Sequence, residues 1–462
     1  MPLDADLLAI AAPESRRPPA GSFPFLLLVL AIVSSAAAGE SGSVVPAGRS
    51  GPPPTGRSAI PHDGPVVRIG LLVGVPDCTI RCEGGVRIWR RGSGLRGSRF
   101  GPGVTLRMRA ARVEDRQSRP RGQALPLPGW GVRLSLAPRG ALGTFPEELL
   151  IEPLSSAHPL WVDGCSYRGE ILVRAGAPER LNVINAVRLE DYLRGVVPLE
   201  IGSEGVAPAA MRAQAIAARS YALFYLGRRA AAGCDLFAGP DDQVYGGIPA
   251  ETDAATRAVV ATRGIVAVWE GLPIRANYCS TCGGATESSD RVWPGESYPY
   301  LRAVRDRDGD DCFCEASRYF RWKERWSCAQ LQQIIREHLP REVPAARGGD
   351  LGALTGLKAK RRSPSGRIEL LEIQMEGGRF RVRADRIRWV LRRPDGGLLR
   401  STWIGKLQVD RDTGCHVTLE GAGYGHGVGM CQMGARELAR RGLSAPQILR
   451  HYYRGITFAR WW

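Results

Sequence analysis

Short runs that mix apolar and polar residues, separated by Gly and Pro, dominate the chain from Val66 to about residue 180. Residues 66–73 (VVRIGLLV) and 132–136 (VRLSL) are two examples. Such runs are typical of half-buried strands, because successive side chains of a strand point to opposite faces of its sheet. We therefore predict a β-rich unit over residues 65–180, with loops in the Arg- and Gly-rich stretch between Arg90 and Gly129.

The pattern changes to a helical one over residues 208–227. This segment contains strong helix formers without an internal breaker, and Pro208 suits the first position of a helix. We predict a helix here, against which another element can pack closely. Its apolar stripe consists mostly of small residues that recur every three or four positions, namely Met211, Ala215, Ala218, Ala222 and Tyr225.

The rest of the chain mixes both patterns, which predicts an α+β fold. The β-rich N-terminal unit is followed by a second unit, residues 181–462, in which the long helix packs on a sheet. Shorter helices are expected over 328–338 and 443–453, and strands over 264–269, 274–278, 367–373 and 416–420.

The N-terminus has the parts of a secretory signal. Arg16 and Arg17 precede an apolar run over residues 25–33, and small residues follow it up to Ala38. This arrangement predicts a signal peptide over residues 1–38, with an uncleaved anchor as the alternative. Residues 39–64 are rich in Gly, Pro and Ser and predict a disordered linker. We expect an exported protein of the periplasm or cell envelope, without a membrane-spanning segment beyond the signal.

Composition narrows the choice of partner. Hydrophobic residues make up 44% of the chain and charged residues 24%, which is typical of a globular protein. The formal net charge is +17, and most of the positive charge comes from Arg. No basic run contains interleaved aromatic residues, so we expect no nucleic-acid partner. A diffuse positive surface is also compatible with an anionic polymer of the cell envelope as the partner.

Eleven cysteines stand out in a protein expected to be exported, because thiols can pair in an oxidising compartment. The odd number leaves at least one cysteine without a partner inside the chain. Cys78 and Cys82 are close enough in sequence to suggest a local disulfide. Two further close pairs could hold zinc, form disulfides or remain thiols, and we expect their four sulfurs to lie together: Cys279, Cys282, Cys312 and Cys314.

Residues 421–435 (GAGYGHGVGMCQMGA) form a glycine-rich run around His426. Glycine at this density disfavours a helix or strand interior and suits backbone that bends sharply or approaches a ligand closely. The run has no G-x-G-x-x-G frame, so it is not a dinucleotide fingerprint. We predict a substrate-facing loop, and a turn-rich loop with a satisfied histidine is the alternative.

Further motifs accompany this loop in a fixed order. Residues 189–200 (LEDYLRGVVPLE) and 211–221 (MRAQAIAARSY) are followed by 243–247 (QVYGG), by 278–287 (YCSTCGGATE) and, after the loop, by 451–455 (HYYRG). Together these blocks resemble the SpoIID/LytB family of cell-wall proteins. The similarity covers roughly residues 180–460, and the number and order of the blocks make it specific.

The resemblance implies a role on peptidoglycan. The sporulation members are lytic transglycosylases that cleave glycan strands already stripped of stem peptides, and the glutamate that acts as their acid matches Glu200. The LytB side of the family enhances a wall amidase without an assured catalytic role. Glycan strands are therefore the expected partner, with a cell-wall amidase as the partner in the alternative function.

The residues around Glu200 support an acid independently. Val196 to Leu199 precede it and Ile201 follows, so the carboxyl is expected in apolar surroundings that raise its pKa. Most glycosidases need two carboxyl groups. A lytic transglycosylase can use one, because the 6-hydroxyl of the muramyl sugar attacks the anomeric carbon. The alternative is a helix-entry carboxylate near the positive end of the following helix.

We assign contacts with the sugar and its lactyl carboxylate to residues on the predicted helix, since Arg suits a carboxylate. Two departures limit what the resemblance implies. Some members bind zinc through Cys and His upstream of the Gln-Val-Tyr block, but residues 234–242 (CDLFAGPDD) contain no His, so we expect no such site. Arg212 also stands where Lys is common. No cofactor is required, and the predicted substrate-binding residues are Arg212, Gln214, Arg219, Tyr221 and His426.

Overall fold

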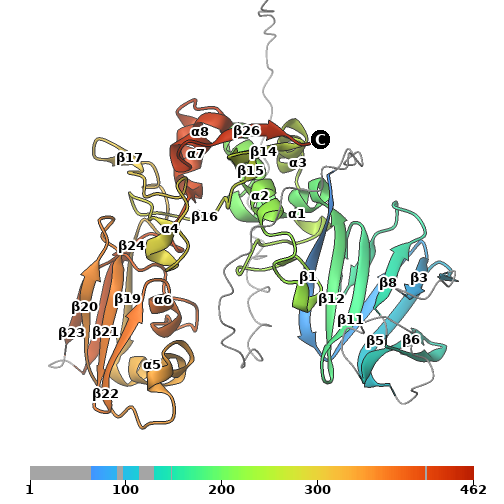
Figure 1. The fold of residues 1–462 in the computed structure, drawn as a ribbon, viewed down its shortest axis with the longest axis horizontal. Helices are drawn as coiled ribbons and strands as arrows, with labels where there is room; N and C mark the ends of the chain where they lie inside the picture. The colour runs from blue at the N-terminus through green and yellow to red at the C-terminus, as the bar shows by residue number, and fades with distance from the viewer. Residues whose placement is uncertain (1–63, 91–96, 114–128, 147, 411–413) are drawn as a thin grey trace, which may run out of the picture. The chain divides into compact units, whose positions relative to one another are not determined.

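The structure, a computed structural model, describes residues 64–90, 97–113, 129–146, 148–410 and 414–462. The predicted signal peptide and the predicted linker, apart from Gly64, lie outside these residues. Strands dominate the first part of the described chain and helices occur in the later part, which confirms the α+β prediction (Figure 1). Among the described residues, no helix is both long enough and apolar enough to cross a membrane.

Two sheets confirm the predicted β-rich unit. Their strand orders are β13-β1-β12-β11-β8-β3-β4 and β10-β9-β2-β5-β6-β7. Side chains from both sheets, such as Ile80, Leu106 and Ile151, form one buried core. The strands are β1 (Val66–Val75), β2 (Asp77–Cys82), β3 (Val86–Arg90), β4 (Ser98–Phe100), β5 (Val104–Arg112), β6 (Trp130–Ala137), β7 (Gly140–Phe145), β8 (Leu149–Pro153), β9 (Leu160–Val162), β10 (Cys165–Tyr167), β11 (Glu170–Ala177), β12 (Arg180–Arg188) and β13 (Leu236–Phe237).

Three expectations for this region need correction. The stretch between Arg90 and Gly129 contains a long strand, β5, in which Val104, Leu106 and Met108 are buried. Its alternation was obscured by the Arg residues between them. The expected boundary at residue 180 falls on the first residue of β12, which pairs with β11 in one sheet.

Cys78 and Cys82 do not form a disulfide. Both are buried free thiols on the same strand, β2. Residues four apart in an extended strand are separated by roughly 13 Å, far beyond the reach of a disulfide. The structure instead contains a disulfide between Cys328 and Cys415, with a sequence separation of 87.

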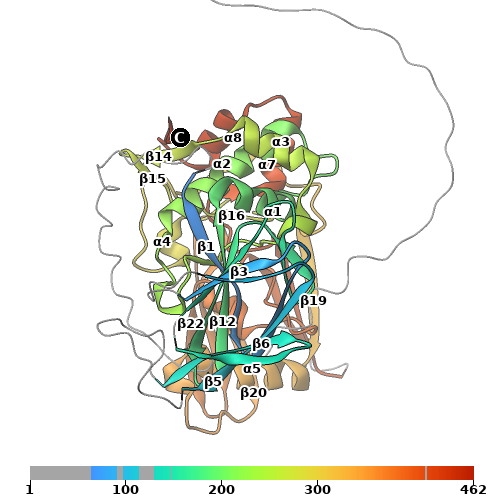
Figure 2. The ribbon, with the colours of Figure 1, turned by 90° about the vertical axis from the view of Figure 1, so that its right-hand side faces the viewer.

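Helix α2 (Pro208–Phe224) confirms the predicted long helix and forms the centre of the helical region (Figure 2). Most of its residues are buried, and their small side chains allow close packing on several sides. It packs against the other helices of this region and against β14. These elements are α1 (Leu189–Ile201), α3 (Asp253–Ala261), α7 (Gln432–Arg440), α8 (Ala445–Tyr452), β14 (Ile265–Trp269), β15 (Leu272–Pro273) and β26 (Thr457–Arg460).

Residues 321–422 contain a second helix-and-sheet region with a hydrophobic core of its own, around Trp326, Leu371 and Leu419. The main-chain path therefore leaves the core around α2 after residue 314 and returns to it at residue 428. The elements of this region are β19 (Arg321–Ser327), α5 (Cys328–Glu342), β20 (Leu354–Arg362), β21 (Ile368–Met375), β22 (Gly378–Arg383), α6 (Arg386–Val390), β23 (Ile404–Asp410) and β24 (His416–Ala422).

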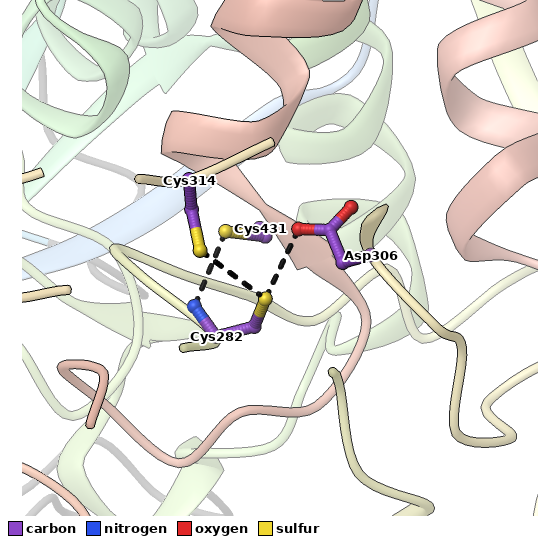
Figure 3. Close-up of side chains that lie close together, drawn as sticks. All are labelled: Cys282, Asp306, Cys314 and Cys431. Carbon is purple, nitrogen blue, oxygen red and sulfur yellow. Dashed lines mark hydrogen bonds between the residues drawn. The ribbon is translucent and has the colours of Figure 1, made fainter. Parts of the chain in front are cut away.

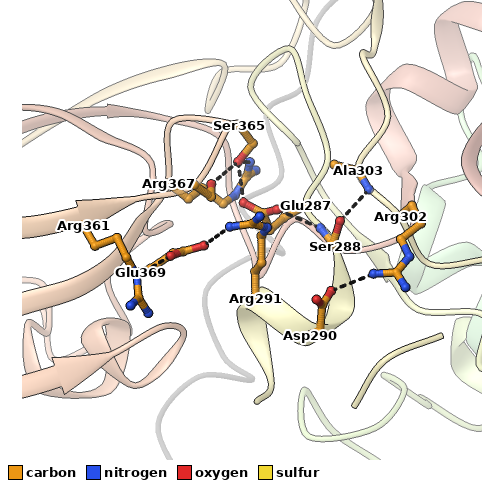
Figure 4. A network of polar contacts seen from close by, with 11 residues as sticks. Glu287, Ser288, Asp290, Arg291, Arg302, Ala303, Arg361, Ser365, Arg367 and Glu369 are labelled. Carbon is orange, nitrogen blue, oxygen red and sulfur yellow. Dashed lines mark hydrogen bonds and ion pairs between the residues drawn. The ribbon is translucent and has the colours of Figure 1, made fainter. Parts of the chain in front are cut away.

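Polar contacts connect this inserted region to residues 287–303 (Figure 4). Arg291 forms an ion pair with Glu369, and the Ser365 hydroxyl donates to Glu287 at 2.6 Å. Arg367 is 2% exposed and donates to the carbonyl oxygen of Cys282 at 2.7 Å. These contacts, of which the one from Arg367 is buried, fix the loop after Cys282 against the inserted region.

The helix predicted over 443–453 is α8, which begins with a capping box formed by Ser444 and Gln447. The predicted strand over 274–278 is wrong except at its end, because only Tyr278 and Cys279 pair, with Met430 and Cys431. The remaining short elements are α4 (Ser289–Val292), β16 (Tyr278–Cys279), β17 (Arg307–Asp308), β18 (Asp311–Cys312) and β25 (Met430–Cys431).

Candidate active site around Glu200

Glu200 lies in the last turn of α1, which ends at Ile201 and is followed by Gly202 with a φ of 80°. The next helix begins only at Pro208. The alternative of a helix-entry carboxylate is therefore wrong, because Glu200 sits at the negative end of a helix. A helix C-terminus disfavours a carboxylate and contributes nothing to holding it ionised.

Two neutral groups hold the Glu200 carboxyl. The backbone N–H of Val244 donates to Oε1 at 2.8 Å, and Nε2 of Gln432 donates to Oε2 at 3.1 Å. The residue as a whole is partly exposed. Burial raises its pKa above the usual range, while hydrogen bonds from Val244, Gln432 and Tyr278 oppose that rise.

The Gln-Val-Tyr block, residues 243–245, holds the backbone N–H that donates to Glu200. Nε2 of Gln243 donates to the Tyr278 hydroxyl at 2.9 Å, and the Tyr192 hydroxyl donates to Oε1 of Gln243 at 3.2 Å. The Tyr245 hydroxyl donates to Asn185 at 3.0 Å, which connects the block to β12. Gln243 is fully buried. The backbone N–H of Val244 is therefore fixed in direction by the residues on both sides of it.

Gln214 and Tyr221, two of the predicted substrate-binding residues, face this site from α2. Oε1 of Gln214 accepts from Gln432 at 3.4 Å, while its buried Nε2 has no hydrogen-bond partner among the described residues. The Tyr221 ring lies 6.4 Å from the Tyr278 ring, and its hydroxyl donates to Asp242 at 3.4 Å. Because they are seven residues apart, the two side chains share one face of the helix.

Arg219 does not reach this site, which corrects its assignment as a substrate contact. Its side chain is 0% exposed and forms a two-pronged ion pair with Glu190, at 2.8 and 2.7 Å. A third donor, Nη1, reaches the carbonyl oxygen of Ile265. Arg212 lies seven residues earlier on α2 and is exposed near the start of the helix. Although the seven-residue spacing places both arginines on one face of the helix, Arg219 is buried and Arg212 is exposed.

His426 is partly exposed in the glycine-rich loop. Its Nδ1 accepts from the backbone N–H of Val428 at 3.0 Å, and its ring lies 4.9 Å from the ring of Trp293. These neighbours, and not Glu200, define its environment. Burial is the largest influence on its pKa, which is lowered to about 4, so the ring is neutral at pH 7.

A group of aromatic rings extends from Tyr221 along the same region. The Tyr221 and Tyr225 rings are 4.6 Å apart, and the Arg275 guanidinium lies 4.5 Å from the Trp293 ring and 5.5 Å from the Tyr225 ring. Tyr225, Trp293 and Tyr298 are partly exposed. Partly exposed aromatic rings beside a few polar groups are a common lining of ligand sites.

The cysteine prediction is half correct (Figure 3). Cys282 and Cys314 lie together, with their sulfurs 3.7 Å apart. Their other neighbours are Cys431 and Asp306, and the four ligand atoms all lie within 4.8 Å of one another. Cys279 and Cys312 do not belong to this group of four. We refer to Cys282, Asp306, Cys314 and Cys431 as the cysteine–aspartate cluster.

Sequence reasoning assigned no role to several residues that make the site. Val244, Tyr278 and Gln432 contact the Glu200 carboxyl, and each lies inside a motif used for the resemblance. The order of those motifs was therefore the available signal. Cys431 also lies in such a motif, whereas nothing in the sequence around Asp306 distinguishes it from other surface-like aspartates.

Comparison with known proteins agrees with this geometry. Residues 177–269, which contain Glu200 and α2, match the family model SpoIID, described as "Stage II sporulation protein". Residues 307–429 match a domain of unknown function, DUF8618, and include the inserted region with its separate core. The chain thus carries a SpoIID domain followed by a second recognisable region.

Curated relatives extend the similarity. The chain is 28% identical over 357 residues to the Amidase enhancer of Bacillus subtilis, an alignment that covers 68% of this chain and 47% of that protein. It is 29% identical over 292 residues to Stage II sporulation protein D of Bacillus amyloliquefaciens, covering 60% and 75%. An uncharacterized protein of Brachyspira hyodysenteriae is 26% identical over 301 residues, covering 64% and 73%. Residues 177–269 therefore match a SpoIID domain, and the chain is similar to proteins of the SpoIID/LytB family.

Proposed function

We propose that this protein is an exported enzyme of the cell envelope that cleaves peptidoglycan glycan strands by lytic transglycosylation. Its relatives carry the names of a sporulation protein and an amidase enhancer, which supports a role in the cell wall. The resemblance matches Glu200 with the catalytic acid of the sporulation members. Strands stripped of stem peptides are the proposed substrate.

The observation that carries this proposal is the environment of the Glu200 carboxyl. Burial raises its pKa, and its described partners at both oxygens are uncharged donors. A carboxyl with a raised pKa holds a proton closer to neutral pH, as a general acid requires. The same two donors then stabilise the carboxylate that remains after the proton has left.

The reaction can proceed with one carboxyl group. Glu200 gives its proton to the glycosidic oxygen as the bond from that oxygen to the anomeric carbon breaks, leaving an oxocarbenium-like centre. The 6-hydroxyl oxygen of the same muramyl sugar bonds to the anomeric carbon, and its proton passes to the Glu200 carboxylate. The products are a strand end with a 1,6-anhydro-muramyl ring and a released sugar hydroxyl. The acid is regenerated without water.

Other residues have supporting roles in this proposal. Gln214 is fully buried and supports the site by accepting from Gln432, the residue that donates to Glu200, which corrects its assignment as a sugar contact. Exposed Arg212 is available to a lactyl carboxylate. The partly exposed rings of Tyr225, Trp293 and Tyr298 offer flat apolar faces to sugar rings. Tyr221 packs beside Tyr225, and neutral His426 lies beside Trp293.

A second candidate is a non-catalytic module that binds peptidoglycan and stimulates a wall amidase. The 28% identity to a protein named Amidase enhancer favours this reading, although the alignment covers 47% of that protein. In this case the Glu200 region would bind glycan without cleaving it. The two candidates make different predictions for one assay.

The assay incubates the mature protein with denuded glycan strands and analyses the products by mass. We expect anhydro-muramyl products from the wild type and none from Glu200→Gln, which retains the size of the side chain and lacks the transferable proton. Glu204→Gln is the matched control, because Glu204 is exposed four residues away. Intact strands with tight binding by both proteins would favour the amidase enhancer, and equal cleavage by both would remove Glu200 from the reaction.

A further inference from the structure

The cysteine–aspartate cluster brings together Cys431 and three residues from the stretch 282–314, which lie more than a hundred positions earlier in the sequence (Figure 3). Cys282, Asp306, Cys314 and Cys431 are each 0% exposed. Cys282 begins a glycine turn, Cys314 follows β18, and Cys431 immediately precedes α7. Residues of this kind, converging from separate loops into the protein interior, form a candidate site that is distinct from Glu200 and its partners.

The sulfur spacing within the cluster suits a shared metal ion. The Cys282 and Cys314 sulfurs are 3.7 Å apart, and Sγ of Cys282 lies 3.0 Å from Oδ2 of Asp306. Two zinc–sulfur bonds of about 2.3 Å at a tetrahedral angle place their sulfurs about 3.8 Å apart. A disulfide would require about 2.05 Å. The sulfur spacing is therefore that of two ligands of one ion.

The surroundings orient the ligand atoms. Oδ2 of Asp306 faces the sulfurs, while its Oδ1 accepts from the Tyr452 hydroxyl at 2.8 Å and lies 3.2 Å from Nε2 of His451. This is the arrangement of an outer shell that fixes a ligating carboxylate. A Cβ at Gly434 would overlap with Asp306 and Tyr452, so the start of α7 needs glycine to approach the cluster.

Backbone N–H groups point at the sulfurs. Cys431 accepts from the N–H of Cys282 at 3.2 Å and from that of Gly434 at 3.4 Å. Cys282 accepts from the N–H of Gly284 at 3.4 Å. Gly283 and Gly284 have φ values of 83° and 113°, a conformation that glycine allows and that lets the chain fold back over the sulfur. Such donors stabilise thiolate ligands.

The charge of the cluster also calls for a cation. In the described part of the chain, the only ion-pair partner recorded for Asp306 is His451. The nearby Arg367 guanidinium is engaged by the carbonyl oxygens of Cys282 and Ala285. A buried carboxylate among three thiols is costly unless a positive charge compensates it. A divalent ion bonded to all four side chains would supply that charge.

We propose that Cys282, Asp306, Cys314 and Cys431 bind one zinc ion in a closed, structural site. Thiolates favour zinc among the common divalent ions, and four protein ligands without an open position are typical of structural rather than catalytic zinc. The ligand set retains Cys282 and Cys314 from the sequence prediction. It replaces Cys279 and Cys312, because Cys279 packs against Gly425 and the Cys312 sulfur lies beside Gly284.

The position of the ion would matter for the neighbouring site. Cys431 directly precedes Gln432, whose amide donates to Glu200. The parallel pairing of β16 with β25 places Tyr278 beside the same segment. The ion would therefore fix the start of α7, and with it a donor to the carboxyl. The metal site itself does not depend on the proposed reaction, since binding of the ion can be measured without any substrate.

The test measures metal in untagged, full-length mature protein purified without chelator. We expect about one zinc per chain by elemental analysis. Cys282→Ser, Cys314→Ser and Cys431→Ser should each lose most of it, and Asp306→Asn should bind it more weakly. Cys279→Ser and Cys312→Ser are the matched controls and should retain the metal. They change cysteines of the same two sequence pairs that lie outside the cluster.

Cobalt substitution of the wild type provides a test that does not depend on the folding of variants. Co²⁺ should give the intense visible bands of a tetrahedral ion and near-ultraviolet sulfur charge transfer, unchanged in the Cys279→Ser and Cys312→Ser proteins. Absence of both metals from the folded wild type would overturn the proposal. So would a Cys282–Cys314 disulfide in non-reduced peptides, or loss of metal in a control variant but not in Cys431→Ser.

Discussion

Two carboxylates on one helix, Glu190 and Glu200 of α1, have opposite environments. Glu190 is 1% exposed and shares its two oxygens with the Arg219 guanidinium, with further donors from the Gly264 N–H and the Trp462 indole. Glu200 is half-buried and receives one backbone and one amide donor. Glu190 thus belongs to a complete ion pair, whereas Glu200 has no cationic partner within the described part of the chain.

The difference separates a structural role from a chemical one. A buried carboxylate and the guanidinium that matches it form a structural pair, and removing either partner leaves a buried charge. A carboxyl held by neutral donors can exist in both protonation states, because no partner requires its charge. The comparison predicts that Glu190 supports the fold and that Glu200 supports the reaction.

The largest expected effect is on turnover by the Glu200→Gln protein. Loss of a general acid should lower the rate of anhydro-product formation by about 10²–10⁴-fold, while the thermal unfolding midpoint stays close to that of the wild type. The measurement is product formation under saturating strands, next to a melting curve. If the variant lost activity together with a large drop in its melting midpoint, Glu200 would have a structural role like that of Glu190, and the prediction would be wrong.

Substitution of Glu190 should instead lower the stability of the fold. Glu190→Gln leaves Arg219 buried without its anion and should lower the free energy of unfolding by about 3–5 kcal/mol, measured by denaturant titration. Glu337→Gln removes an exposed partner of Arg341 on α5, with 56% and 61% of the two side chains exposed, and should cost less than about 1 kcal/mol. Equal losses in the two variants would contradict the assigned role of the buried pair.

Local patterns explain what the sequence predicted of the fold. The Ala-rich segment after Pro208 predicted α2 because a helix records its period in neighbouring residues. The strand β5 was not predicted because Arg residues occupy its outward positions. The Arg- and Gly-rich composition of this stretch indicated loops, although its apolar residues alternate as in a strand. Short pairings such as β16 with β25 depend on partners 152 positions away, as in Tyr278 with Met430, and leave no local pattern.

The same limit applies to the site. Arg212 and Arg219 are seven residues apart on α2 and so lie on one face of the helix, but this spacing could not show that Glu190 pairs with one of them in the interior. Family motifs identified Glu200, whereas the Val244 N–H beside it is a backbone group that any residue could supply. The ligands grouped with Cys282 lie 24, 32 and 149 residues away, so the close C-x-C and C-x2-C pairs pointed to the wrong partners.

A smaller effect should follow from removing one donor to Glu200. Gln432→Met keeps the length of the side chain and removes a hydrogen bond that favours the ionised carboxyl. The pKa of Glu200 should therefore rise further, and the alkaline limb of the pH–rate profile should move to higher pH. Gln333→Met, at an exposed position of α5, is the control. An unmoved limb with an unchanged rate would mean that Gln432 does not tune the acid.

The smallest expected effect concerns stability against pH. Burial raises the pKa of Glu200 in the folded protein, so the folded state holds its proton more tightly than the unfolded state does. This contribution to stability is fully present below the unfolded pKa and is lost as pH rises through the folded pKa. Glu200→Gln has no such group. Its free energy of unfolding, relative to the wild type, should therefore increase between acid and neutral pH and then become constant.

Denaturant titrations at several pH values would measure this difference, with Glu204→Gln as the background for removing one exposed carboxylate. If the free energy of unfolding of Glu200→Gln relative to the wild type instead increased toward acid pH, the folded protein would stabilise the charged form of the Glu200 carboxyl. In that case the surroundings of Glu200 would favour the charge on its carboxyl, which is the opposite of what a general acid requires. The acid role proposed for Glu200 would then lose its physical basis.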